Sequence, residues 1–448
     1  RNFSFSLNYN QKMQFEASKR VSVDVNGGTS VWAFVNVLRR KYNAINHGQG
    51  FPDWESPKFV KQAGIKAINE NWNQYAPNTG NANIINELIK VYNKKYNYKY
   101  TLKSDNIQIT NGCAGAIDSC LQAFVNTDDE VITFEPYFDF YRIQTGHSMG
   151  KLVTFPLDLK MDKNGEKIWS LDPHKLKSVL NKRSKILLLN TPHNPTGFVM
   201  TLEQMKQIEL ILKDYPRIIV IMDEVYDHIL YDNMKHHYFA ALSDDLFNRT
   251  IVCSSAAKTF SVTGWKIGWA VGPSHLIKYV NYTCRGHAWC INNPLQQGMA
   301  TVLQSVNNKF GKFNNYYEYL SDVYVTNRKL MMNALKGSGM NPIPCKGAYY
   351  IMVDASKYIN ILRSKNVFVK LQLNKPETFY DWQFVKWMII NIGVACIPGS
   401  AFLNYNNINK NSNFNFVRFA FCCKPETIKK SAKKLRKLNH ILGSKSKL

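Results

Sequence analysis

The chain has 448 residues, of which 45% are hydrophobic and 20% are charged, an ordinary composition for a folded globular protein. This length allows a large core and about two domains, and no apolar run approaches the roughly 18 residues that a membrane-spanning helix needs. The net charge of +25 would suit a nucleic-acid partner, but the basic residues are scattered and carry no nucleic-acid-binding motif. We therefore expect no nucleic-acid partner and no membrane partner.

Cysteine and histidine spacing argues against a disulfide framework and against a metal site. The nine cysteines include no C-x-x-C pair, and several, such as Cys253, Cys396 and Cys422, stand among apolar residues. This pattern favours buried thiols in a reducing compartment. The ten histidines show no spacing typical of metal ligands, so no metal is expected.

The two ends of the chain carry targeting signals that point to different compartments. Residues 1–12 contain Arg, Lys, Ser and Asn but no acid, as an organelle leader does. The last three residues, Ser446-Lys447-Leu448, form a peroxisomal signal if they are the native C-terminus. The expected location is the cytoplasm or the mitochondrion, or the peroxisome if that C-terminus is native.

In chain order, the sequence from about residue 130 to residue 271 alternates short apolar runs with longer amphipathic segments. The runs "EVITF", "KILLL", "RIIVIM" and "TIVCSS" predict strands, and residues 202–212 predict a helix by their 3.6-residue periodicity. Such alternation indicates an α/β fold with a mainly parallel, doubly wound sheet.

Beyond about residue 325 the pattern changes to that of a smaller α+β domain. Strands are predicted in "GAYYIMVD" and "FNFVRFAF", helices in "QFVKWMIIN" and in the basic tail, and an irregular loop over residues 360–377. The predicted division is an N-terminal arm with part of the small domain (1–50), a large cofactor-binding domain (51–325) and a small C-terminal domain (326–448).

Polar residues follow the predicted strands of the large domain, where ligands bind in sheets of this kind. Asn194 lies in the turn-rich "NTPHNPTG", where it predicts either an amide donor for a ligand oxygen or a plain turn. Asp223 begins "DEVY" directly after a buried strand. Its carboxylate would pair with a protonated ring nitrogen, or would cap a following helix.

Two further segments suit a phosphate and a reactive amine. "GCAGAI" (112–117) is a small-residue loop that opens a helix, and free N–H groups at a helix N-terminus bind phosphate. Lys258 follows Ser255 by three residues and precedes Lys266 by eight. Small neighbours would let a cofactor reach a lysine that acts as a nucleophile.

Together these are the parts that pyridoxal phosphate requires: a lysine, an acid for the ring, an amide and a phosphate cradle. From about Met13 onward the chain resembles the class-I aminotransferases of fold type I, in particular the kynurenine–oxoglutarate transaminase and cysteine-S-conjugate β-lyase branch. The motifs that carry the resemblance are "NHGQGFPD", "EPYFDFY", "LNTPHNPTG", "DEVY", "KTFSVTGWKIGW", "ACIPGSAF" and "VRFAF".

The resemblance implies roles for residues that should lie together in the folded chain. Lys258 is the internal-aldimine lysine, Asp223 holds the pyridinium nitrogen protonated, and Tyr226 contacts the ring hydroxyl together with Asn194. The other residues implied to bind the cofactor are Phe138 on the ring face, the phosphate group of Gly112, Cys113, Ala114, Ser255 and Lys266, and Tyr75 from a neighbouring subunit. The residues implied to bind substrate are Gly50, Trp32, Asn194 and Arg418, and Arg418 holds the α-carboxylate.

The implied activity is transamination in a homodimer with shared active sites. The amino donor is an aromatic, sulfur-containing or glutamine-type L-amino acid such as kynurenine, the acceptor is a 2-oxo acid, and a cysteine-S-conjugate β-lyase side reaction accompanies it. A dedicated carbon–sulfur β-lyase and a non-catalytic regulator on the same fold are the alternatives. Ala114, where close relatives usually have tyrosine, and the altered segment 286–294 leave the substrate preference open.

Overall fold

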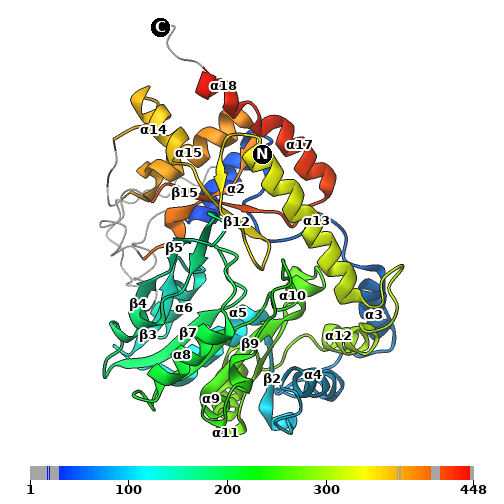
Figure 1. Cartoon of the computed structure of the whole chain (residues 1–448). Helices are drawn as coiled ribbons and strands as arrows, with labels where there is room; N and C mark the ends of the chain where they lie inside the picture. Colours follow the sequence, from blue (N-terminus) through cyan, green and yellow to red (C-terminus); the bar gives the residue numbers. More distant parts are fainter. Residues whose placement is uncertain are drawn as a thin grey trace, which may run out of the picture.

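The computed structural model describes residues 18, 20, 30–370, 372, 375–404 and 414–443. The candidate targeting segments, residues 1–12 and Ser446-Lys447-Leu448, lie outside these ranges. Within them, no helix combines the length and the apolar character needed to cross a membrane. Figure 1 shows a large sheet in the lower part of the molecule and a smaller sheet, flanked by helices, above it.

The large sheet has seven strands and is mainly parallel, as predicted. In spatial order they are β2 (Ile107–Asn111), β10 (Ile267–Val271), β9 (Thr250–Ser255), β8 (Ile219–Asp223), β7 (Ser184–Asn190), β3 (Glu130–Glu135) and β4 (Lys151–Pro156). Only β10 runs antiparallel to its neighbours. The four predicted strands of this region are thus confirmed as β3, β7, β8 and β9.

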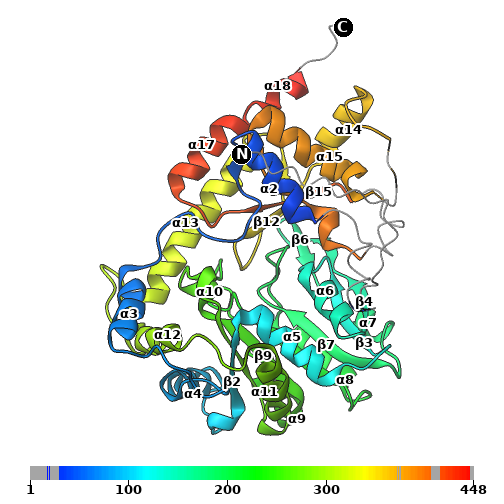
Figure 2. The same ribbon diagram turned by 180° about the vertical axis from the view of Figure 1, so that it is seen from behind.

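Helices cover both faces of this sheet (Figure 2). In β7 the alternating residues Leu187 and Leu189 pack into the larger hydrophobic cluster, whereas Ile186 and Leu188 pack into the smaller one on the other face. The smaller cluster includes α5 (Gly112–Phe124) and α11 (Ser274–Ala288). The larger includes α4 (Ala82–Lys95), α8 (Leu202–Leu212) and α12 (Asn293–Ser305). Burial on both faces explains why these strands read as continuous apolar runs.

The predicted helix over residues 202–212 is confirmed as α8, and its local chemistry explains where it starts. The Thr201 hydroxyl accepts from the Gln204 backbone N–H, and the Gln204 side chain accepts from the Thr201 backbone N–H. This reciprocal capping box satisfies donors that a helix start otherwise leaves free.

The second sheet is antiparallel, with the strand order β11 (Asn341–Pro342), β12 (Tyr350–Asp354), β15 (Phe416–Ala420) and β14 (Ile397–Pro398). Its helices include α13 (Tyr316–Lys336), α15 (Tyr380–Trp387) and α17 (Pro425–Leu435). The N-terminal helix α2 (Val31–Lys41) also packs here, against α15, β14 and β13 (Val394–Ala395). The limits at residues 50 and 325 stay predictions.

Two local predictions need correction. The loop expected over residues 360–377 begins later, because α14 (Ser356–Ser364) continues through its first five residues. Its apolar positions Ile359 and Leu362 are buried one turn apart, which stabilises a helix despite polar neighbours. No helix follows Asp223, where the chain turns instead, so the helix-capping alternative for that residue is wrong.

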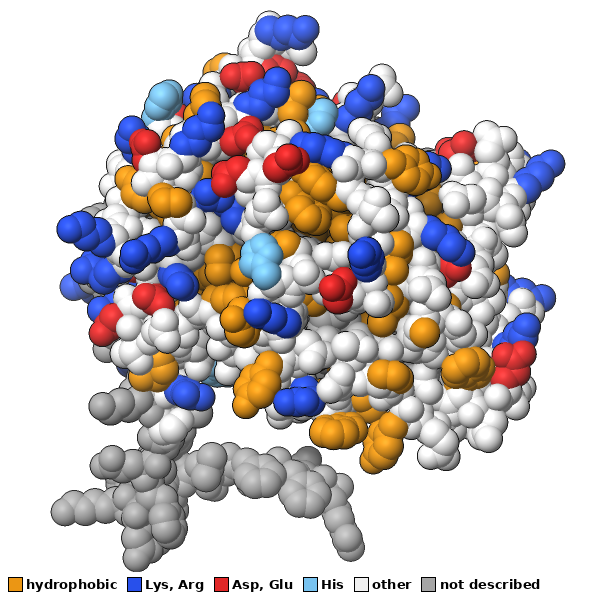
Figure 3. Space-filling model, turned by 90° about the horizontal axis from the view of Figure 1, so that it is seen from below, with side chains coloured by type: hydrophobic (Ala, Val, Ile, Leu, Met, Phe, Trp, Pro, Cys, Tyr) orange, Lys and Arg blue, Asp and Glu red, His pale blue; other side chains and the backbone are white. Residues whose placement is uncertain are grey.

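Basic side chains are spread over the surface. On the face in Figure 3, lysines and arginines stand among acidic and apolar side chains rather than in one continuous field. The helix predicted in the basic C-terminal segment is observed as α17 and α18 (Leu438–Gly443), where Ile428, Leu435 and Leu438 are buried at helical spacing. That spacing leaves the lysines of this segment on the outer side.

Candidate active site

A cavity of about 370 Å³ lies between the ends of three parallel strands and the second sheet. Asn190, Asp223 and Ser255, the last residues of β7, β8 and β9, line one side, while Tyr350 of β12 and Arg418 of β15 line another. Ligand binding at the carboxyl ends of parallel strands is general for sheets of this kind. The cavity therefore joins side chains that both sheets hold in place.

Lys258 projects into this cavity from the single-turn helix α10 (Ala256–Thr259), which follows β9 directly. Its Nζ donates to the Gly50 carbonyl at 2.9 Å. Burial lowers the pKa of this amine to about 8, although the nearby Cys422 and Asp223 favour its charged form. A substantial neutral fraction near neutral pH makes the amine a nucleophile and a proton acceptor.

Asp223 is a buried carboxylate whose bonds come from neutral donors. Tyr141 donates to Oδ2 at 2.6 Å, the Cys113 thiol to Oδ1 at 3.5 Å, and the Val225 backbone N–H to Oδ1 at 3.3 Å. Burial raises the pKa of Asp223, and these hydrogen bonds oppose that rise. Within the described ranges, no lysine or arginine forms an ion pair with it, so a protonated ring nitrogen would supply the missing positive partner.

Arg418 is almost completely buried at the other end of the cavity. Its Nη1 donates to Asn194 Oδ1 at 2.7 Å, and its Nη2 donates to the Gly48 carbonyl at 2.6 Å. Its guanidinium also lies 4.2 Å from the centre of the Tyr350 ring and 5.4 Å from that of Trp32. Both partners of its hydrogen bonds are neutral, so the guanidinium charge is available to a ligand carboxylate.

Gly112 and Lys266 form the cradle that sequence reasoning assigned to a phosphate. Gly112, the first residue of α5, has φ of +72°, and a Cβ there would lie 3.2 Å from Lys266 Nζ. A Cβ on Gly268 would lie 2.3 Å from the Gly112 carbonyl carbon and 2.7 Å from the Cys113 nitrogen. Glycine at both positions thus brings the helix N-terminus, its N–H groups and the Lys266 ammonium together, an arrangement that suits a phosphate dianion.

These residues fit pyridoxal phosphate. Lys258 offers a nucleophilic amine, Asp223 a buried carboxylate that has no ion-pair partner among the described residues, and the cradle at Gly112 a phosphate site, all within one cavity. Tyr226 lines the same cavity, with its hydroxyl 3.0 Å from that of Tyr350. In the described part of the chain, no group of three or more His, Cys, Asp or Glu residues could hold a metal ion.

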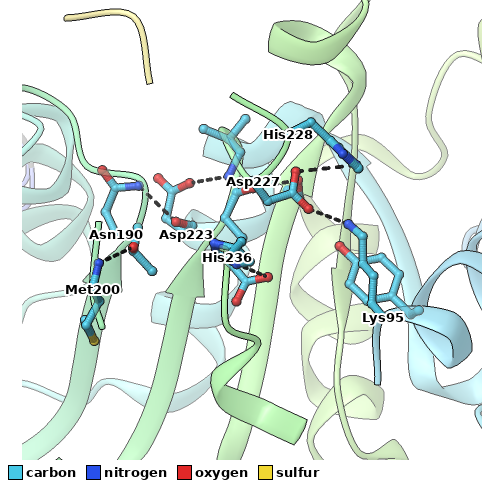
Figure 4. Close-up of polar contacts among 12 residues, drawn as sticks. Lys95, Asn190, Met200, Asp223, Asp227, His228 and His236 are labelled. Carbon is cyan, nitrogen blue, oxygen red and sulfur yellow. Dashed lines mark hydrogen bonds and ion pairs between the residues drawn. The ribbon is translucent and has the colours of Figure 1, made fainter. Parts of the chain in front are cut away.

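The turn that carries Asp223 and Tyr226 is anchored from behind by a buried polar cluster (Figure 4). Asp227 accepts a hydrogen bond from Lys95 of α4 at 2.5 Å and lies 3.8 Å from His228 Nε2. Glu224 lies 3.4 Å from His236 Nε2. Burial tends to raise the pKa of Asp227, but the charges of His228 and Lys95 lower it overall.

Thirteen of the fourteen site residues predicted from sequence line the cavity. They are Trp32, Gly50, Gly112, Cys113, Ala114, Phe138, Asn194, Asp223, Tyr226, Ser255, Lys258, Lys266 and Arg418. Tyr75 does not, and its side chain is 83% exposed. Its predicted role in a neighbouring subunit stays a prediction, as do the individual roles of the others.

Among the other lining residues, Tyr141, Tyr350, Asn190 and Asp139 were given no role from the sequence. Asn190 donates to the Asp223 carbonyl at 2.9 Å and accepts from the Asn194 backbone N–H at 2.8 Å. Asp139 accepts from Trp32 Nε1 at 2.8 Å. Tyr141 stands three residues after Phe138 in "EPYFDFY", and this helical spacing was a usable signal for it.

The doubly wound sheet, with lysine, acid and phosphate cradle at its strand ends, defines a pyridoxal-phosphate-dependent enzyme of fold type I. Residues 42–435 match the family model of the class I and II aminotransferases. The chain belongs to this family, whose members use pyridoxal phosphate for amino-group transfer.

Relatives and solved structures agree with this assignment over nearly the whole chain. Kynurenine–oxoglutarate transaminase of Dictyostelium discoideum is 34% identical, over 95% of this chain and 97% of its own. Human kynurenine–oxoglutarate transaminase 3 is 33% identical, over 95% of this chain and 90% of its own. Bna3p of Saccharomyces cerevisiae, a candidate kynurenine aminotransferase, is structurally similar with a TM-score of 0.85 at 27% identity, over 96% of this chain and all of its own.

Proposed function

We propose that the protein transfers the amino group of an aromatic, sulfur-containing or glutamine-type L-amino acid, with kynurenine among its donors, to a 2-oxo acid. The observation that carries the proposal is that Lys258 and Arg418 line one cavity together with Trp32 and Phe138. The names of the relatives from Dictyostelium and human support kynurenine as a donor.

The residues of the chain divide the chemistry among them. Arg418 binds the α-carboxylate of the incoming amino acid, which fixes its orientation. The Lys258 amine, with its pKa lowered to about 8, takes the proton from Cα and would deliver it to the cofactor carbon that bore the aldehyde. Asp223 keeps the ring nitrogen protonated, and Gly112, Ser255 and Lys266 hold the phosphate. When bound, pyridoxal phosphate supplies the ring that spreads the negative charge left at Cα.

The test is a panel of amino donors against several 2-oxo acids, with purified holoenzyme. The proposal predicts turnover of kynurenine and of at least one further aromatic or sulfur-containing donor. Activity confined to donors outside these classes would contradict it, without removing the protein from its family.

We propose a β-lyase side reaction on the same residues. In a cysteine S-conjugate, loss of the Cα proton to Lys258 lets a good leaving group on Cβ depart as a thiol, and hydrolysis of the remainder by one water would yield pyruvate and ammonia. Pyruvate release in the absence of any 2-oxo acid acceptor measures this reaction. Its complete absence across several conjugates would refute the side activity, and release faster than transamination would favour the dedicated lyase.

A further inference from the structure

The motif "NHGQGFPD" supplies two backbone carbonyls that hold the two charged side chains of the site. The Gly48 carbonyl accepts from Arg418 Nη2 at 2.6 Å, and the Gly50 carbonyl accepts from Lys258 Nζ at 2.9 Å. Neither glycine belongs to a helix or a strand. Because no ladder of backbone hydrogen bonds holds these residues, contacts from their neighbours fix where the two carbonyls lie.

His47, directly before Gly48, is fully buried and joins this segment to the second sheet and to α17. Its backbone carbonyl accepts from the Ala420 N–H at 2.7 Å, and its Nδ1 lies 2.9 Å from the Ala420 carbonyl oxygen. Its Nε2 lies 2.7 Å from the hydroxyl oxygen of Ser431 in α17. Ala420 ends β15, two residues after Arg418. The residue before Gly48 is thus fastened to the strand that carries Arg418.

The partners of His47 determine where its ring carries a proton. Because a carbonyl can only accept, Nδ1 donates to Ala420, and Nε2 accepts from the Ser431 hydroxyl. Burial lowers the pKa of His47 to about 4, although the Ala420 carbonyl and Asp53 favour the charged form, so the ring is neutral at neutral pH. A buried pair of polar side chains costs desolvation that an apolar pair would avoid. When fully hydrogen-bonded, such a pair fixes a single arrangement of the elements it joins.

We propose that His47 is a positioning residue for amino transfer: it holds the Gly48 carbonyl against β15, which fixes the Arg418 guanidinium and the place of the substrate α-carboxylate relative to Lys258. This inference rests on the proposed function, in which Arg418 binds that carboxylate. Small errors in the placement of a bound substrate have large effects on rate. His47 does not line the cavity, so it acts through Gly48 and Arg418.

3-Phenylpropanoate measures the carboxylate site without turnover, because it has a carboxylate and an aromatic ring but no amino group. Its dissociation constant from the holoenzyme is followed by cofactor absorbance. His47→Leu keeps a side chain of similar size and removes both side-chain hydrogen bonds, so this constant should rise about tenfold, with the affinity for pyridoxal phosphate retained. Ser431→Ala removes one of the two bonds and should give a smaller rise. Tyr358→Phe is the control, because it removes a buried hydroxyl that donates to the Ser338 carbonyl away from the cavity, and it should leave binding of the probe unchanged.

A double-mutant cycle in kcat/KM for an amino donor decides whether His47 acts through Arg418. His47→Leu should lower kcat/KM about tenfold in the wild type but less than about twofold in Arg418→Ala, which has already lost the guanidinium. An equal fall in both backgrounds, unchanged binding of the probe in His47→Leu, or an equal loss in Tyr358→Phe overturns the inference. If His47→Leu does not fold, unchanged binding in Ser431→Ala overturns it instead. Failure of the proposed function looks different, because the wild type then turns over no kynurenine or other aromatic donor.

Discussion

At the scale of single residues, burial of Lys258 determines the pH range in which its amine is neutral and can react. With a pKa of about 8, the neutral fraction rises about tenfold between pH 7 and pH 9 and then levels off. We therefore expect the cofactor-free enzyme to capture pyridoxal phosphate with a rate constant that follows this curve, measured by stopped-flow absorbance. A rate that rises about a hundredfold over the same interval and keeps rising to pH 10 would indicate an ordinary lysine.

Arg418 should act on substrate and not on cofactor. Arg418→Ala removes the charge and leaves the Gly48 carbonyl and Asn194 Oδ1 without their donor. We expect kcat/KM for amino donors to fall about a hundredfold or more, with cofactor absorbance retained. Arg418→Lys keeps the charge but loses the planar guanidinium, so its kcat/KM should lie between those of the wild type and Arg418→Ala. Loss of cofactor from Arg418→Ala would contradict this division of roles.

Three of the residues that sequence reasoning missed depend on distant parts of the chain. Tyr141 meets Asp223 across 82 residues, Trp32 meets Asp139 across 107, and Tyr226 meets Tyr350 across 124. Asp223 and Lys258 could be predicted because each directly follows a strand whose apolar pattern is local. The Tyr141 hydroxyl has only the local signal of its spacing from Phe138, and that spacing does not indicate which carboxylate it meets, because packing brings the two together.

At the scale of elements, the contact between β10 and the start of α5 shapes the phosphate cradle. Gly268→Ala would press a methyl group against the Gly112 and Cys113 backbone and push the helix N-terminus away. We expect a weaker affinity for pyridoxal phosphate and a loss of about 1–3 kcal/mol in the free energy of unfolding. Gly264→Ala is the matched control, since a Cβ there meets nothing within 4 Å. Equal cofactor affinity in both variants would contradict the proposed cradle.

At the scale of the whole molecule, we propose that the protein is a homodimer. The Tyr75 side chain is 83% exposed and lies outside the cavity, so a role at the phosphate would require a second copy of the chain. We expect a dimer by sedimentation and weaker cofactor binding in Tyr75→Ala. Mixing Tyr75→Ala with Lys258→Ala subunits should restore one complete site per heterodimer. Failure to restore tight binding in the mixture would rule out a role across subunits.

The sequence predicted the overall architecture better than it predicted the pairing of individual strands. Strand–helix alternation over residues 130–271 predicted the parallel sheet because burial on both faces produces continuous apolar runs. The antiparallel β10 and the pairing of β15 with β12 and β14 depend on long-range contacts that no local pattern encodes. That second sheet nevertheless places Arg418 opposite the strand ends of the first, so long-range pairing completes the site.

The central claim is that the Lys258 amine bonds covalently to pyridoxal phosphate. Borohydride reduction of the purified holoenzyme, followed by peptide mass mapping, tests it directly. The account predicts one pyridoxyl group on the peptide that contains Lys258, and none in Lys258→Ala. A stable adduct on a different lysine, or no adduct in a protein shown to hold the cofactor, would contradict it.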